Sequence, residues 1–159
     1  MFQPLKAKVD PPNYQFNVST LEDFYPEKLI SDLEKKYGKA DVIEDKSGIQ
    51  TLRFYVSELR FKFPVIVQSR EGKILDSFSR LPNYFLHDVF LQSLVNRIGK
   101  QDLFKKADEE AVYIWTNKDN LKFIYSAACT ITCFPIFFTV HPATPSFTPQ
   151  IEKMRKSLK

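Results

Sequence analysis

The sequence has little glycine and cysteine, and it has no long apolar run. Its 159 residues include only 4 Gly and 2 Cys. So few glycines exclude collagen-like and glycine-rich low-complexity chains. No stretch approaches the roughly 18 apolar residues of a membrane-spanning helix. A chain of this length can bury a hydrophobic core without metal or disulfide support, so we expect one domain or a close pair of small ones.

The sequence also lacks the short motifs of common catalytic chemistry. It contains no glycine-rich phosphate-binding loop, no G-x-S-x-G and no H-E-x-x-H. A zinc site would have to use Cys129, Cys133, His87 and His141 together, and no signature spacing links these four residues. We therefore expect no enzyme activity, no cofactor and no metal. A metal or thiol enzyme that uses Cys129, Cys133 and His141 is the alternative.

Cys129 and Cys133 leave two interpretations open. On a straight strand their Cα atoms would lie roughly 13 Å apart, too far for a disulfide. A turn or bulge at 130–132 would bring them together, whereas buried free thiols would act as small hydrophobic side chains. The apolar stretch around both residues disfavours the thiolate that a nucleophilic cysteine needs. Two cysteines fit an oxidising or a reducing compartment equally well.

The net charge of +4 is carried by the two ends of the chain. Residues 1–19 hold two basic and one acidic residue, and residues 142–159 hold four basic and one acidic residue. The intervening residues 20–141 are neutral, with 17 residues of each sign. The basic character therefore describes the ends and gives little support to nucleic-acid binding.

Basic and aromatic residues do alternate in Arg60-Phe61-Lys62-Phe63. Sheets that stack nucleic-acid bases expose their aromatic rings. In a strand, however, this alternation places the two phenylalanines on the face opposite the two cations. We therefore expect no nucleic-acid partner.

Hydrophobic periodicity predicts two helices and six strands. Apolar residues at helical spacing predict a helix over 26–37, with Pro26 in its first turn and Gly38 just after its end. A second helix follows Pro82 and ends before Gly99. Its apolar stripe consists of Leu86, Phe90, Leu94 and Ile98. The predicted strands are 51–56, 59–63, 74–80, 111–116, 121–129 and 133–141. The predicted turns are Ser57-Glu58, Arg70-Glu71-Gly72-Lys73 and Asn117-Lys118-Asp119-Asn120.

The second half of the sequence repeats the first. An offset of about 61 residues aligns similar residues in both halves, and one inserted residue later moves it to about 62. The aligned pairs include Phe24 with Phe85, Leu33 with Leu94, Gly38 with Gly99, Asp41 with Asp102 and Phe54 with Trp115. A second alignment, of Phe63-Pro64 with Phe134-Pro135, leaves the register of the last hairpin open. We expect an α+β fold of two tandem helix plus antiparallel β-meander repeats that share one helix-covered sheet. The expected segments are an extended N-terminal arm over 1–19, repeat 1 over 20–80, repeat 2 over 81–141 and a basic C-terminal tail over 142–159.

Each half ends its helix with Leu-x-x-x-x-Gly-x-x-Asp and carries an aromatic residue on the following strand. This pattern resembles that of the β-lactamase-inhibitory-protein-like fold, which includes the SmpA/OmlA outer-membrane lipoproteins. Ala40 and Gln101 stand where that pattern usually has proline, and no lipobox cysteine lies near the start. The resemblance implies an extracytoplasmic, non-catalytic protein that binds another protein, often through the open face of its sheet.

Alternation along the predicted strands assigns each side chain to a helix-facing or an open face. The residues expected to face the helices are Leu52, Phe54, Leu59, Phe61, Ile74, Phe78, Tyr113, Trp115, Leu121 and Phe123. The candidate partner-binding residues on the open face are Arg53, Tyr55, Arg60, Lys62, Lys122, Phe137 and His141. Arginine and tyrosine are enriched in protein interfaces. We therefore expect a non-enzymatic protein-binding or inhibitor-type module, with a structural accessory of the bacterial envelope and an ordinary solvated face as alternatives.

The two ends of the chain bear on its location. Met1-Phe2-Gln3-Pro4 lacks the basic and apolar regions of a signal peptide. The protein is then either cytoplasmic or the mature form of a periplasmic or otherwise exported chain, and the resemblance favours export. Ile151, Met154 and Leu158 have the spacing of a short basic amphipathic helix. Such a helix docks on the body of the protein or on an anionic membrane, and a frayed terminus is the alternative.

Overall fold

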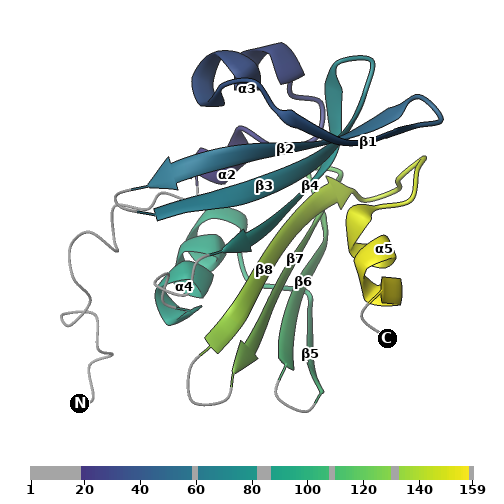
Figure 1. Cartoon of the computed structure of the whole chain (residues 1–159). Coiled ribbons are helices and arrows are strands. Elements are labelled where there is room, and N and C mark those ends of the chain that lie inside the picture. The colour runs from purple at the N-terminus through teal and green to yellow at the C-terminus, as the bar shows by residue number, and fades with distance from the viewer. Residues whose placement is uncertain (1–18, 59–60, 82–86, 108–109, 130–132, 158–159) are drawn as a thin grey trace, which may run out of the picture.

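The structure is a computed structural model that describes residues 19–58, 61–81, 87–107, 110–129 and 133–157. It consists mostly of one antiparallel sheet of eight strands with a few short helices, an α+β arrangement (Figure 1). The helices are α2 (Ser19–Glu22), α3 (Ile30–Tyr37), α4 (His87–Ile98) and α5 (Gln150–Ser157). The strands are β1 (Asp41–Lys46), β2 (Ile49–Glu58), β3 (Phe61–Arg70), β4 (Lys73–Leu81), β5 (Leu103–Ala107), β6 (Glu110–Lys118), β7 (Leu121–Cys129) and β8 (Cys133–Pro142). Most of the expected N-terminal arm, residues 1–18, lies outside this description.

Strands β4 and β8 join two runs of four strands into one sheet. The strand order is β1-β2-β3-β4-β8-β7-β6-β5, and every neighbouring pair is antiparallel. The β4–β8 pairing extends from Ser77 with Val140 to Leu81 with Ile136. The hydroxyl of Thr139 also donates a hydrogen bond of 2.6 Å to the carbonyl of Ser77 across this joint. The two outer strands, β1 and β5, are therefore the edges of the sheet.

Among the described residues, three hairpins have two-residue turns in which both residues take positive φ. They are Ser47-Gly48 (φ 56° and 78°), Glu71-Gly72 (53° and 77°) and Asp119-Asn120 (52° and 67°). Two consecutive positive φ angles are the geometry of type I′ turns, whose twist matches that of the flanking strands. The turns predicted near 70–73 and 117–120 are confirmed.

The turn predicted at Ser57-Glu58 is wrong. Both residues belong to β2, where Ser57 pairs with Lys62 and Glu58 with Phe61 of β3. The strands β1 and β5 have no counterpart among the predicted strands. All six residues of β1 are exposed, so this strand has none of the apolar alternation that reveals a half-buried strand.

The first helix begins later than its apolar spacing predicts. Glu27 has a φ of 77°, which no α-helix accommodates. Its N–H donates to the carbonyl of Ile74 at 2.9 Å, and the N–H of Ile30 donates to the carbonyl of Gly72 at 2.8 Å. Residues 27–30 thus lie along the β3–β4 turn, and α3 starts only at Ile30.

Side chains from α2, α3 and α4 share one hydrophobic core with one face of the sheet. Leu33, Phe54, Leu94 and Trp115 are all buried there, and the indole N–H of Trp115 donates to the carbonyl of Gly99 at 2.7 Å. Of the residues expected to face the helices, those found in or packed against this core are Leu52, Phe54, Ile74, Tyr113, Trp115, Leu121 and Phe123. The side chains of Leu59 and Phe61 lie outside the described residues.

Phe78 is the exception, because β4 contains a bulge. Gln68 pairs with Asp76 whereas Ser69 pairs with Ile74, so Leu75 is an extra residue in β4. A bulge of one residue reverses the alternation that follows it. Ile74 therefore lies in the core, whereas Phe78 lies on the opposite face, where its ring centre is 5.4 Å from that of Phe137.

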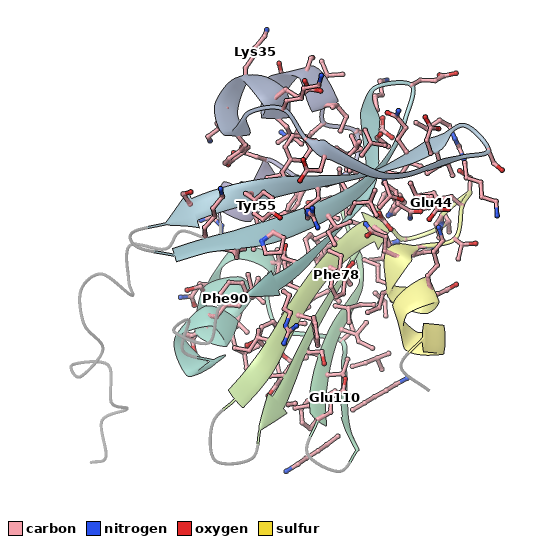
Figure 2. All side chains as sticks on the ribbon, viewed as in Figure 1. Lys35, Glu44, Tyr55, Phe78, Phe90 and Glu110 are labelled. Carbon is pink, nitrogen blue, oxygen red and sulfur yellow. The ribbon has the colours of Figure 1, made fainter. Side chains whose placement is uncertain are left out.

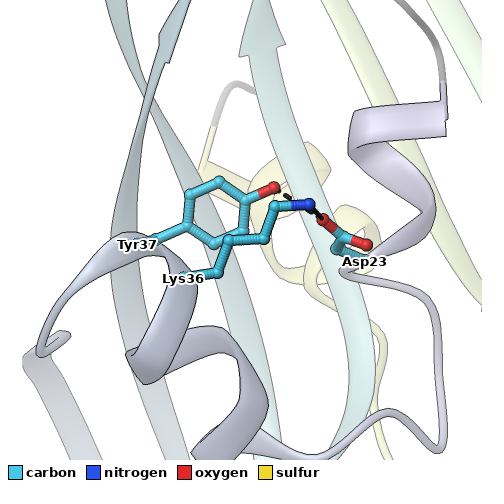
Figure 3. A network of polar contacts seen from close by, with 3 residues as sticks. All are labelled: Asp23, Lys36 and Tyr37. Carbon is cyan, nitrogen blue, oxygen red and sulfur yellow. Dashed lines mark hydrogen bonds and ion pairs between the residues drawn. The ribbon is translucent and has the colours of Figure 1, made fainter.

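Asp23 ties the segment after α2 to the end of α3 (Figure 3). One of its carboxylate oxygens accepts hydrogen bonds from the ammonium of Lys36 and the hydroxyl of Tyr37, both at 2.7 Å. Burial raises the pKa of Asp23, but these two hydrogen bonds and the charge of Lys36 outweigh burial. The pKa is therefore lowered from its ordinary value of 3.8.

We predict that Asp23→Asn lowers the free energy of unfolding at neutral pH by about 0.5 kcal/mol, a small value because solvent screens this half-exposed ion pair. Since the pKa is lowered in the folded state, the contribution is present above 3.8 and is lost as the pH falls through the lowered value. Urea denaturation at neutral pH and below pH 3.8 measures both effects. Glu34→Gln, at an exposed position of α3, is the control. A deficit of Asp23→Asn that persisted at low pH would contradict the assignment.

Candidate functional site

The face of the sheet opposite the hydrophobic core carries most of the candidate partner-binding residues, and we call it the second face. In Figure 2, Tyr55 and Phe78 are seen on the strands of this sheet and Phe90 on α4. A row of paired residues crosses its middle from β3 to β6. This row consists of Ile66, Phe78, Thr139, Ile124 and Ile114. All of them except the half-buried Ile66 are buried, so the centre of the second face is closed to solvent.

Helix α5 closes one end of the second face. The carboxylate of Asp76 accepts hydrogen bonds from the backbone N–H and the side-chain amide of Gln150, both at 2.8 Å. It also accepts hydrogen bonds from the side-chain amide of Gln68 at 3.0 Å and from its backbone N–H at 3.3 Å. Gln150 is the first residue of α5. Asp76 therefore caps this helix from the sheet, satisfying an N–H group that has no partner within the helix.

Further polar contacts around Asp76 hold α5 in place. The ammonium of Lys153 donates to the side-chain carbonyl of Gln68 at 2.9 Å, and the side-chain amide of Gln150 also lies 3.0 Å from the carbonyl of Ile66. Asp76 is fully buried. Burial raises its pKa, and the four N–H groups oppose that rise by stabilising the carboxylate. Of the interpretations left open for the C-terminal tail, docking on the body of the protein is the one found.

The other end of the second face carries a cluster of three side chains, of which Tyr55 and Lys62 are exposed. The phenol ring of Tyr55 has the guanidinium carbon of Arg53 5.4 Å from its centre and the ammonium of Lys62 4.9 Å from it. Arg53 also forms an ion pair of 3.1 Å with Asp41. Two cation–π contacts to the same ring favour a defined orientation of the tyrosine side chain.

The remaining candidate residues are spread over the second face. Phe137 is half-buried between its pairing partners Arg80 and Ser126. Lys122 is half-buried and pairs with His141. Arg60 lies outside the described residues. The structure therefore groups Arg53, Tyr55 and Lys62 at one ring and places Phe137 beside Arg80. Lys122 and His141 lie beyond the central row, towards the α5 end.

His141 is buried, with 5% of its surface exposed, so it does not present its ring to solvent in this conformation. Burial lowers the pKa of His141, with a smaller opposing effect from the carbonyl of Pro142. Its Nδ1 lies 2.6 Å from that carbonyl oxygen. Because a carbonyl oxygen only accepts, Nδ1 is the donor of this hydrogen bond. His141 thus acts locally as a satisfied buried histidine.

Sequence reasoning missed Asp76 and its partners. Asp76 interrupts an otherwise apolar and small stretch of β4, and this charge in a buried strand was the available signal. Its partner Gln150 lies 74 positions later in the chain, so no local pattern connects the two residues.

The structure brings the two cysteines close along the backbone but describes no cofactor site. Cys129 and Cys133 pair directly across the β7–β8 hairpin, and their side chains lie outside the described residues. Among the residues described, no group of three or more His, Cys, Asp or Glu lies close enough to hold a metal ion. Within the same residues, no helix has the length and apolar character needed to cross a membrane.

No protein-family model, curated protein or solved structure matches this chain. The resemblance to the β-lactamase-inhibitory-protein-like fold therefore stays a prediction.

We predict that Asp76→Asn destabilises the protein by about 2 kcal/mol, because the new amide group would face two N–H donors where the carboxylate oxygen accepted them. The amide protons of α5 should lose their protection against hydrogen exchange before those of the sheet do. Hydrogen exchange measured by mass spectrometry reports both regions. Glu152→Gln, an exposed change on α5, should alter neither quantity. Unchanged protection of α5 in Asp76→Asn would mean that the cap does not hold this helix.

Proposed function

We propose that this protein is a non-enzymatic protein-binding module that contacts its partner through the Tyr55 end of the second face. The observation that carries the proposal is the exposed side chain of Tyr55, whose ring contacts both Arg53 and Lys62. Tyrosine and arginine supply much of the binding energy in protein interfaces. Because the ring is already fixed on a strand, binding would lose little side-chain entropy.

The charges at this end indicate the chemistry of the partner. Lys62 and Arg80 are exposed, and Arg53 forms an ion pair of 3.1 Å with Asp41. A protein that presents carboxylates together with an apolar or aromatic contact for the Tyr55 ring would complement this surface. Charge complementarity of this kind accelerates association and excludes wrong partners.

We also propose that the fold consists of two tandem repeats that share one helix-covered sheet. Supporting it, the chain follows the order helix then four strands twice, with α3 before β1–β4 and α4 before β5–β8. Gly38 and Gly99 follow these helices with φ of 90° and 87°. Phe54 and Trp115 are both buried on the second strand of each run.

The proposed repeats also agree with the family resemblance, which implies protein binding by such a sheet. Asp41 and Asp102 occupy equivalent positions, and each accepts hydrogen bonds from the second strand of its own run, from Arg53 and from Thr116 respectively. The resemblance is also the reason to propose an exported, periplasmic location, with a cytoplasmic location as the alternative.

Crosslinking followed by affinity measurement tests this function. A photoreactive amino acid at position 55 should capture a partner in the source cells, whereas one at Lys35 on α3, away from the second face (Figure 2), should not capture the same protein. With the purified partner, we predict that Tyr55→Ala and Arg53→Ala each weaken binding at least about tenfold, as for interface hot spots.

The variant Lys35→Ala is the matched control and should bind within about twofold of wild type, as expected for a position outside the interface. Thermal denaturation should show that all three variants stay folded. If Tyr55→Ala and Arg53→Ala both bind like wild type, the Tyr55 end of the second face is not the contact surface.

A further inference from the structure

The two edges of the sheet are exposed along most of their length. Strands β1 and β5 each have a neighbour on one side only, so part of their backbone N–H and C=O groups face outward. All six residues of β1 are exposed, and so are the first four of β5. Such an edge is a template for pairing with another strand.

Both edges also expose apolar side chains. Val42 and Ile43 on β1 are 60% and 48% exposed, and Leu103 and Phe104 on β5 are 45% and 51% exposed. Six large hydrophobic side chains are exposed among the described residues, and four of them lie on these two short strands. Apolar surface concentrated on two edges is typical of an interaction site.

The charges of the two edges are opposite. Strand β1 contains Asp41, Glu44 and Asp45 with a single lysine, whereas β5 contains Lys105 and Lys106 and no acidic residue. A symmetric contact of β1 with β1, or of β5 with β5, would place like charges opposite each other, which is destabilising. A contact of β1 with β5 places unlike charges together.

A bulge in β1 means that the two edges are not matched residue by residue. Val42 pairs with Leu52 whereas Glu44 pairs with Thr51, so Ile43 is an extra residue. Glu44 and Asp45 project from opposite faces of β1, as Lys105 and Lys106 do from β5, so the charge complementarity concerns the two edges as a whole. Seven antiparallel pairings separate β1 from β5 within one molecule, so these two strands run in opposite directions. Copies in the same orientation therefore bring β1 and β5 together as antiparallel neighbours.

We propose that copies of this chain associate head to tail, with the β1 edge of one copy against the β5 edge of the next. The contact is heterologous, so it leaves a free β1 edge and a free β5 edge at the two ends of any assembly and permits chains longer than a dimer. It does not use the Tyr55 end of the second face, so it is separate from the proposed partner binding.

Sedimentation velocity tests the proposal with two charge-reversed proteins. Wild type should increase in mass with concentration, beyond twice 18.6 kDa, and should return towards the monomer at high salt because exposed ion pairs are screened. Lys105→Glu with Lys106→Glu should be monomeric, and so should Glu44→Lys with Asp45→Lys. An equal mixture of these two proteins should associate again, because each reversed edge then meets a complementary edge.

Lys28→Glu with Lys35→Glu is the matched control for the double change in β5, since it lowers the net charge by the same amount at exposed positions outside both edge strands. This control should associate like wild type. Three results would each overturn the proposal. The first is a wild type that stays monomeric at every concentration, and the second is a charge reversal at either edge that leaves association unchanged. The third is a mixture that stays monomeric although circular dichroism shows both proteins to be folded.

Discussion

The pairing of β4 with β8 is the constraint on which the rest of the structure depends. It joins two four-stranded runs into one sheet, so that Phe54 from the first run and Trp115 from the second pack in one core. It also makes the row from Ile66 to Ile114 continuous across the second face. Because β4 and β8 occupy the middle, β1 and β5 are left at the two edges. The core, the second face and both edges thus follow from one antiparallel pairing.

A single extra residue in β4 determines which part of the second face is covered by α5. The bulge at Leu75 turns Asp76 away from the core and towards α5. A buried carboxylate is strongly destabilising unless it is hydrogen-bonded, and Asp76 accepts four N–H groups, two of them from Gln150. The C-terminal helix α5 therefore stabilises the buried carboxylate of Asp76, which the bulge places on the second face. One end of the second face is closed as a result, and Tyr55 stays exposed at the other end.

Local patterns predicted the parts of this fold that depend on short stretches of sequence. Alternation and turn residues identified β6 to β8 and two of the hairpin turns that have type I′ geometry. Alternation also assigned Arg53, Tyr55 and Lys62 to the same face of the sheet, where their side chains contact one another. Features set by distant residues were not predictable in this way. Glu27 leaves the helix because it bonds to Ile74, the bulge is defined only by the partner strand, and the burial of His141 depends on neighbours far along the chain. The edge strand β1 was missed because it buries no face that would impose a period.

The neutral charge of residues 20–141 conceals a segregation that only the topology reveals. On the proposed duplication, β1 and β5 are equivalent first strands of their runs, and Glu44 and Asp45 occupy the positions of Lys105 and Lys106. Had both runs kept the same charges, every contact between two edges would oppose like charges, which is a common protection of edge strands against association. The charge reversal between equivalent strands removes that protection only for the pairing of β1 with β5. Repulsion between like charges still disfavours the pairing of β1 with β1 and of β5 with β5. A second copy can therefore distinguish the two edges of the sheet by their charge.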